Sequence, residues 1–315
     1  MITERRQGKT TLLAMRNKHL LVEAAPEVGG RIVTLQNLES GHQYLWRNPS
    51  LELERLPAGS EYDPNFYGGI DELLPNDIPE EPQVPLDHGE LWTLALDAEC
   101  RGERIVMSGT LPICGLHYER AMELSTEGPE LMLRYRITNT TESTRRFLWK
   151  FHAALNIREG DEILCPATTA VAADPELSRW KQSQPFSWPQ VQEQRADIIP
   201  PKASDTDFLY LYDLRSGYMG WRRPGGDLAF AYQFDKDIFP YCWYFASYGG
   251  FYGHYTAVLE PCTTMPCSLN EAAALGQCSQ LKAGETLETE VRIYAGTESG
   301  LEKFLEHPLK TQLGR

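Results

Sequence analysis

The strongest candidates for chemistry lie on one predicted β-strand, residues 147–157. Every odd-numbered residue of this segment is apolar, so Lys150, His152 and Asn156 share the opposite face of the strand. An imidazole can transfer protons near neutral pH, and the ammonium and amide groups beside it can donate hydrogen bonds to hydroxyl groups. This face is suited to binding a sugar or to catalysis on one, although an exposed histidine without a function fits the same pattern.

A second candidate is Glu260, which ends the apolar run 256–259. Pro261 restricts the residue before it to an extended conformation, and this fixes the direction of the Glu260 side chain. Strand alternation places His254 and Thr256 on the same face as Glu260. A carboxylate held in this way can act as a general base. The alternative is a strand-end carboxylate that is exposed to water.

The irregular segment 47–90 supplies further polar candidates. His88 and Gly89 stand at the mouth of a predicted strand, where the glycine allows the backbone to approach a ligand closely. Carboxylates crowd residues 67–77, Asp71 among them. They could bind sugar hydroxyls, hold a calcium ion or keep the loop soluble, and solubility is the favoured explanation for most of them.

These residues require a scaffold of strands. Segments of alternating apolar and polar residues, bounded by turn residues, recur along the chain and are typical of a many-stranded antiparallel protein. They are residues 19–26, 30–37, 90–99, 103–109, 117–125, 130–139, 145–157, 207–214, 227–234, 255–261 and 288–296. One helix is predicted near the C-terminus, with Ser299 as its cap and Glu302 completing a capping box. The pattern predicts an all-β sandwich with few short helices, and residues 1–315 are expected to form a single domain.

A second irregular segment covers residues 172–206 and has weak hydrophobic periodicity. Long irregular loops are uncommon in compact domains and are often functional. Trp180 and Trp188 could pack this segment down as a lid, but a surface loop is the favoured interpretation.

Composition narrows the functional classes. The 315 residues include 30 Lys and Arg against 44 Asp and Glu, a formal net charge of −14, which argues against nucleic-acid binding. No stretch approaches the roughly 18 apolar residues that a membrane-spanning helix needs, and the N-terminus lacks the apolar core of a signal peptide, so a cytoplasmic location is expected. Seven scattered cysteines without a CxxC pair favour neither disulfides nor zinc. A strongly anionic substrate would need a local basic cluster, for which the candidates are Arg31, Lys150, Arg222 and Arg223.

Taken in order, several short motifs make the chain similar to the aldose 1-epimerase (galactose mutarotase-like) superfamily. They are Gly29-Gly30-Arg31-Ile32, Gly68-Gly69 with Pro75, His88-Gly89, His152 with Asn156, and Leu259-Glu260-Pro261. The resemblance covers residues 19–295. It implies a large antiparallel β-supersandwich with a concave sugar-binding face, and chemistry that needs neither a metal nor a cofactor.

The resemblance also implies roles for individual residues. A histidine at the position of His152 acts in the family as general acid toward the ring oxygen, and a glutamate at the position of Glu260 acts as general base on the anomeric hydroxyl. The histidine of the His-Gly motif, here His88, helps to hold the substrate. We expect the remaining substrate-binding residues to be Arg31, Asp71, Lys150, Asn156 and Trp243. The predicted activity is interconversion of the α and β anomers of an aldose.

Two other functions fit the same residues. A non-catalytic carbohydrate-binding or sensing protein on the same fold would not need the acid–base pair. An epimerase or lyase would use the same face to abstract a proton from a carbohydrate. In each case the expected partner is a small sugar, without nucleic acid or membrane, and the sequence leaves the oligomeric state open.

Overall fold

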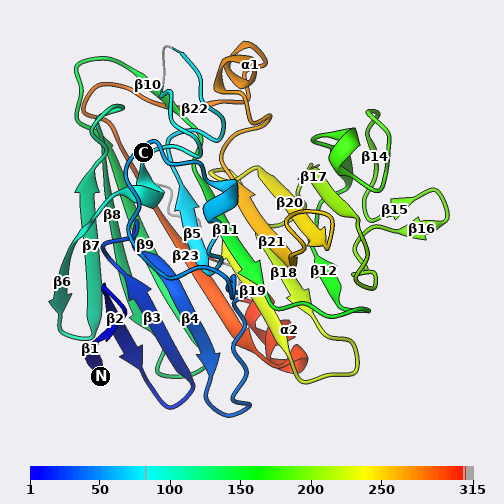
Figure 1. Ribbon diagram of the computed structural model, residues 1–315, viewed down its shortest axis with the longest axis horizontal. Helices are drawn as coiled ribbons and strands as arrows, with labels where there is room; N and C mark the ends of the chain where they lie inside the picture. The colour runs from blue at the N-terminus through cyan, green and yellow to red at the C-terminus, as the bar shows by residue number, and fades with distance from the viewer. Residues whose placement is uncertain (82–83, 308, 310–315) are drawn as a thin grey trace.

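The computed structural model describes residues 1–81, 84–307 and 309, which form two stacked β-sheets (Figure 1). All pairings between the named strands of this described part are antiparallel, as the alternating sequence pattern predicts. Among the same residues, no helix is both long enough and apolar enough to cross a membrane.

The larger sheet has 11 strands within the described residues, in the order β1-β2-β3-β4-β5-β11-β21-β20-β17-β13-β14. Its strands are β1 (Ile2–Gln7), β2 (Thr10–Arg16), β3 (Leu20–Ala25), β4 (Arg31–Asn37), β5 (Ile70–Leu73), β11 (Lys150–Leu155), β13 (Thr169–Ala172), β14 (Phe186–Ser187), β17 (Thr206–Tyr212), β20 (Tyr241–Tyr248) and β21 (Tyr255–Cys262).

The second sheet has eight strands in the described chain, in the order β12-β18-β19-β23-β9-β8-β7-β6. Its strands are β6 (Asp97–Arg101), β7 (Arg104–Thr110), β8 (Leu116–Leu124), β9 (Glu130–Asn139), β12 (Glu162–Leu164), β18 (Tyr218–Arg222), β19 (Ala229–Phe234) and β23 (Thr286–Gly296). The short strands β10 (Arg145–Phe147) and β22 (Ser279–Leu281) pair with each other, as do β15 (Gln190–Val191) and β16 (Gln194–Arg195). The helices are α1 (Leu269–Ala274), α2 (Glu298–Leu305) and the 3-10 turns η1 (Asp63–Asn65), η2 (Leu91–Thr93) and η3 (Pro175–Leu177).

The apolar faces of the two sheets pack against each other and form the core. The ring of Trp149, just before β11, lies 4.9 Å from that of Tyr135 on β9, and the ring of Phe151 on β11 lies 5.3 Å from that of Tyr232 on β19. All four side chains are buried. The odd-numbered residues of the strand that carries His152 therefore face the core, as the alternation predicts.

A charged group is buried in this core between the sheets. Glu72 on β5 accepts hydrogen bonds from Tyr118 (3.0 Å), Arg120 (2.8 Å), Tyr135 (2.9 Å) and the Trp149 indole (3.0 Å). Because the carboxylate has an ion-pair partner and four donors, the cost of removing it from water is largely offset. These bonds join β5 of the larger sheet to β8 and β9 of the second sheet.

Two predicted strands differ from the structure. In residues 90–99, the backbone N–H of Leu94 donates to the carbonyl of Leu91, so η2 forms there and β6 begins only at Asp97. Residues 145–157 are divided between β10 and β11, because the N–H of Leu148 donates to Pro75 and the N–H of Trp149 donates to Thr263.

The predicted C-terminal helix is present as α2, but its cap is Thr297 rather than Ser299. Thr297 Oγ1 accepts from the N–H of Gly300 at 3.2 Å. The sequence did not predict helix α1 or strands β1, β2, β5, β12, β13, β14, β15, β16, β18, β20 and β22. β20 has a nearly continuous run of buried and half-buried apolar residues rather than an alternating pattern, because side chains cover both of its faces.

Candidate active site

The strand order β5-β11-β21-β20 brings together residues that are far apart in the sequence (Figure 1). Asp71 on β5 is the cross-strand partner of His152 on β11. The register of β11 with β21 places Glu260 opposite His152 on the other side, and Glu260 pairs with Trp243 on β20. Directly opposed residues share one face, with Cβ atoms about 4.5–5.5 Å apart. Asp71, His152, Glu260 and Trp243 thus form one row across the sheet.

A cavity of about 150 Å³ opens over this row, on the side of the larger sheet that faces away from the core. This is several times the minimum of about 10–15 Å³ that one water molecule needs, so the cavity can admit a small organic ligand. Its lining combines ionisable groups with an apolar wall. The lining residues are Tyr62, Asp63, Phe66, Asp77, His88, Lys150, His152, Leu177, Phe208, Phe245, Phe251 and Glu260.

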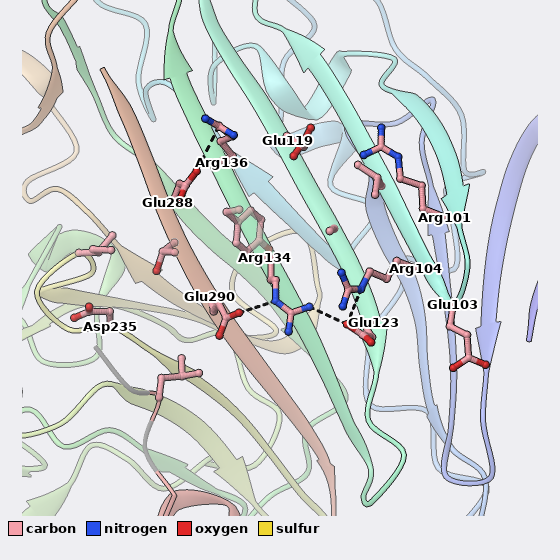
Figure 2. A pocket seen from close by; sticks show the side chains of 16 residues that line it. Arg101, Glu103, Arg104, Glu119, Glu123, Arg134, Arg136, Asp235, Glu288 and Glu290 are labelled. Atoms are coloured by element: carbon pink, nitrogen blue, oxygen red, sulfur yellow. Dashed lines mark hydrogen bonds and ion pairs between the residues drawn. The ribbon is translucent and has the colours of Figure 1, made fainter. Parts of the chain in front are cut away.

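A broader hollow of about 760 Å³ lies on the outer face of the second sheet, far from these residues (Figure 2). Its charged side chains largely neutralise one another across neighbouring strands. Arg134 pairs with Glu290 at 2.6 Å and with Glu123 at 2.8 Å, and Arg136 pairs with Glu288 at 3.5 Å. Such exposed ladders of opposite charge are ordinary on a solvated sheet, so the smaller cavity is the stronger candidate for a site.

His152 is held from beneath by Asp71 and Tyr62. Its Nδ1 atom lies 3.2 Å from Asp71 Oδ1 and 3.1 Å from Tyr62 Oη, and the phenol donates to Asp71 Oδ2 at 2.7 Å. Burial alone would raise the pKa of Asp71, but Arg31, at 2.7 Å, and His152 outweigh burial and lower this pKa to about 2. An ionised carboxylate at Nδ1 leaves Nε2 as the imidazole nitrogen that is free to face the cavity.

Lys150 joins two carboxylates of the cavity. Its Nζ atom lies 2.6 Å from Glu260 Oε2 and 2.7 Å from Asp77 Oδ1, and it stands 4.3 Å over the centre of the Trp243 ring. Burial would lower the pKa of Lys150, but the two carboxylates outweigh burial and raise it. The pKa of Asp77 shifts in the opposite direction: burial would raise it, but Lys150 and His88 outweigh burial and lower it. Lys150 therefore remains a cation that fixes the position of Glu260.

His88 forms one side of the cavity. Its ring stacks on Tyr62 at 4.1 Å between centroids, and its Nδ1 atom lies 2.7 Å from Asp87 Oδ1. Burial would lower the pKa of His88, but Asp77 and Asp87 outweigh burial and raise it. The glycine after it has a role in the backbone. Gly89 has φ +77°, and a Cβ atom there would meet the carbonyl oxygen of Leu74 at 2.4 Å, so the close approach is to the protein's own chain.

The other predicted binding residues, Arg31, Trp243 and Asn156, do not line the cavity. Arg31 and Trp243 lie behind the cavity wall and contact Asp71 and Lys150 respectively. Asn156 follows the end of β11, and its amide donates to the backbone carbonyls of residues 43 and 45 at 3.0 and 2.9 Å. Asn156 is therefore not brought together with the others.

The two irregular segments contribute more to the site than the sequence suggests. Solubility is the wrong explanation for Asp71, Glu72 and Asp77, because all three are buried. Segment 47–90 also supplies Tyr62 and Asp63, which the sequence did not single out because they follow no periodic pattern. Segment 172–206 is more than a surface loop. Its strands β14, β15 and β16 extend to the right of the sheet in Figure 1, but η3 brings Leu177 to the cavity.

The calcium interpretation finds no support in the described residues. Within them, no group of three or more His, Cys, Asp or Glu side chains is placed to hold a metal ion. The acidic side chains that the sequence suggested as ligands are instead engaged with Arg31, Lys150 and His88. Asp71 and Asp77 thus have cationic partners from the protein itself.

The two sheets and the position of the cavity define a galactose mutarotase-like fold, and comparison with solved structures agrees. A protein from Klebsiella pneumoniae that has been proposed to be an aldose 1-epimerase superimposes with a TM-score of 0.74 at 14% identity, over 97% of this chain and 85% of that one. A galactose mutarotase-like protein from Clostridium acetobutylicum gives a TM-score of 0.70 at 14% identity, over 94% of this chain and 98% of that one.

A third similar structure, a galactose mutarotase-like protein from Lactobacillus casei, gives a TM-score of 0.66 at 14% identity, over 90% of this chain and 99% of that one. No protein-family model matches the chain, and no curated protein matches its sequence. The fold predicted from the short motifs is therefore confirmed, in a sequence that has diverged far from these proteins.

Proposed function

We propose that this protein interconverts the α and β anomers of a neutral aldose, with His152 as general acid and Glu260 as general base. The observation that carries this proposal is the opposed pair itself. An imidazole backed by a buried carboxylate stands across from a second carboxylate at the floor of a cavity of about 150 Å³.

Ring opening requires two proton transfers. Glu260 removes the proton from the anomeric hydroxyl O1, the bond between C1 and the ring oxygen O5 breaks, and His152 delivers a proton to O5. The product is the open-chain aldehyde, bound to a protonated Glu260 and a neutral His152. Asp71 orients the His152 ring through Nδ1, and Lys150 holds the Glu260 carboxylate in place.

Ring closure reverses these transfers after rotation about the C1–C2 bond. The O5 hydroxyl attacks C1 from the other face, His152 takes the O5 proton back, and Glu260 returns its proton to the former aldehyde oxygen. Both side chains regain their initial protonation states. The cycle therefore balances with the residues of this chain and water.

The charges around the cavity favour a neutral sugar over a sugar phosphate. Among the described residues that line the cavity, Lys150 is the one lysine or arginine, and two carboxylates already neutralise it. Arg222 and Arg223, the other candidates for a basic cluster, pair instead with Glu162 at 2.6 Å and Asp161 at 3.0 Å. A phosphate in the cavity would meet carboxylates beside a lysine that is already paired with two of them.

The test is the rate of exchange between α and β anomers, measured by saturation-transfer NMR on free aldoses and on sugar phosphates. We expect acceleration for neutral aldoses and a loss of about 10²-fold or more in Glu260→Gln, as is typical when a general base is removed. Glu288→Gln is the matched control, because this exposed glutamate on β23 undergoes the same chemical change on the other sheet.

Four outcomes would contradict the proposal. Full activity in Glu260→Gln would remove Glu260 from the mechanism. Acceleration confined to sugar phosphates would refute the neutral substrate. If the unmodified protein causes NMR shifts on sugar binding but does not accelerate anomer exchange for any sugar, a non-catalytic carbohydrate-binding protein is favoured. Formation of a new sugar product would favour an epimerase or lyase.

A further inference from the structure

An exposed aromatic side chain stands at the tip of the hairpin between β20 and β21. Tyr252 is 61% exposed and has φ +50°, in the left-handed region that bulky residues rarely adopt. Such a conformation is unfavourable for a bulky residue and persists only where the surrounding structure imposes it. Such strain, on a ring that faces solvent, points to a use for the ring.

Tyr252 belongs to a continuous set of rings that begins at the cavity. Its ring centroid lies 4.7 Å from that of Phe251 and 5.9 Å from that of His254, whose ring is nearly parallel to it. The His254 ring lies 4.8 Å from Trp46, which stacks on Phe66 at 5.5 Å. Phe66 and Phe251 both line the cavity. We call these five side chains the aromatic shelf.

The outer part of the aromatic shelf lies outside the cavity. Phe66 and Phe251 line the cavity, whereas Trp46, Tyr252 and His254 do not. Tyr252 and His254 come from the hairpin that precedes β21, which begins at Tyr255. A sugar ring between His152 and Glu260 would therefore leave the outer part of the shelf uncovered.

The chemistry of the shelf fits an uncharged sugar. Pyranose rings present apolar C–H faces that pack on aromatic rings. Burial and the nearby Lys202 lower the pKa of His254, so its ring is neutral near pH 7. The outer rings Trp46, Tyr252 and His254 are all at least partly exposed, and a ligand can reach them.

We propose that the aromatic shelf is a second sugar subsite, so that the protein binds a neutral oligosaccharide with its reducing-end residue in the cavity and the next residue on the shelf. The inference rests on the proposed function for the orientation of the ligand, because the anomeric carbon must lie between His152 and Glu260. It adds a preference for disaccharides over monosaccharides.

The test compares glucose with maltose and cellobiose in the full-length protein, by NMR titration for binding and by anomer exchange for catalysis. The informative variant is Tyr252→Asn, because asparagine tolerates the left-handed conformation and the variant should fold at least as well. Leu275→Ala is the control, since Leu275 is an exposed apolar side chain, 59% exposed, at the end of α1.

We expect Tyr252→Asn to raise the dissociation constant for at least one disaccharide about three- to tenfold, the usual effect of losing one aromatic contact, and to leave that for glucose unchanged. Leu275→Ala should change neither constant. Equal binding of glucose and both disaccharides, or an equal effect of Tyr252→Asn on all three, would overturn the subsite.

Failure of the proposed function is distinguishable from failure of the subsite. Disaccharide binding that depends on Tyr252, without acceleration of anomer exchange, would uphold the subsite and refute catalysis. If Glu260→Gln slows anomer exchange but Tyr252→Asn changes neither exchange nor binding for any sugar, catalysis is upheld and the subsite is refuted. An absence of any sugar binding would refute both.

Discussion

Replacing Lys150 by methionine tests the electrostatic design of the cavity. The substitution keeps the length of the side chain but removes the one cation between Asp77 and Glu260, whose oxygens lie 2.7 and 2.6 Å from Nζ. All three side chains are less than one-tenth exposed. Removing one partner of a buried ion pair typically costs about 3–5 kcal/mol, because the other charge remains without compensation. Near pH 7.5 we expect Lys150→Met to lose stability in that range.

The loss should depend on pH in a defined direction. In the wild type, folding lowers the pKa of Asp77 below the unfolded value of 3.8. Its contribution to the free energy of unfolding is therefore complete above that pH and stays constant between pH 5 and 8. In Lys150→Met we expect burial to raise the pKa of Asp77. A group whose pKa is raised by folding lowers the stability of the protein as the pH increases through its unfolded and folded pKa values. The difference between wild type and variant should therefore widen from pH 5 to pH 8, by up to about 1.4 kcal/mol per pH unit for each proton involved.

Equilibrium unfolding in urea, followed by the fluorescence of the seven tryptophans, measures this difference. Lys236→Met is the matched control, because Lys236 pairs with Asp237 at 3.5 Å on the surface and should change stability by less than about 0.5 kcal/mol. The double variant Lys150→Met with Glu260→Gln should recover part of the loss and flatten its pH dependence. A loss below about 1 kcal/mol, or one that is independent of pH, would refute this account of Lys150.

Two further predictions concern the groups on either face of β5. The pKa of Asp71 is about 2 in the folded protein and 3.8 when unfolded, so Asp71 contributes on the order of 2 kcal/mol that is lost as the pH falls from 4 to 2. In Asp71→Asn, acid titration followed by circular dichroism should show a correspondingly shallower fall in stability over this range, and an unchanged fall would contradict the assignment. Arg120→Met should lower the free energy of unfolding by about 3–5 kcal/mol, because Glu72 would stay buried without its cation. Urea unfolding tests this, and a loss below about 1 kcal/mol would show that the phenols and the indole suffice.

The sequence predicted the layered fold because the alternation of apolar and polar residues is a property of each short segment by itself. Alternation over a few residues identifies which face of a strand is buried, and it separated His152 from the core-facing Phe151 without knowledge of any neighbouring strand. The same reasoning singled out Glu260, although β21 continues past it to Cys262. What it could not supply is the order of the strands, which decides that β21 lies next to β11. The contact of Lys150 with Glu260 depends on that order.

The residues that the sequence missed lie where no periodic pattern exists. Tyr62 and Asp77 belong to an irregular segment, and their positions depend on single interactions, such as the hydrogen bond from Tyr62 to Asp71 and the ion pair of Asp77 with Lys150. From composition alone, the carboxylates of this segment were interpreted as residues that keep a surface loop soluble. In the folded protein Asp71, Glu72 and Asp77 are buried, because Arg31, Arg120 and Lys150 from distant strands reach them.

The row of Asp71, His152, Glu260 and Trp243 also determines when the cavity can form during synthesis. Asp71 is separated from His152 by about 80 residues of chain and His152 from Glu260 by about 110, whereas Trp243 and Glu260 lie on consecutive strands. β21 is the last of the four strands to be made, ending at Cys262. Contacts of such long range form slowly, because the intervening chain must first be ordered. A nascent chain that has left the ribosome only as far as β20 already carries His152 and Asp71, but it lacks the strand between β11 and β20. Sugar binding by growing or truncated chains should therefore begin only after β21 has emerged.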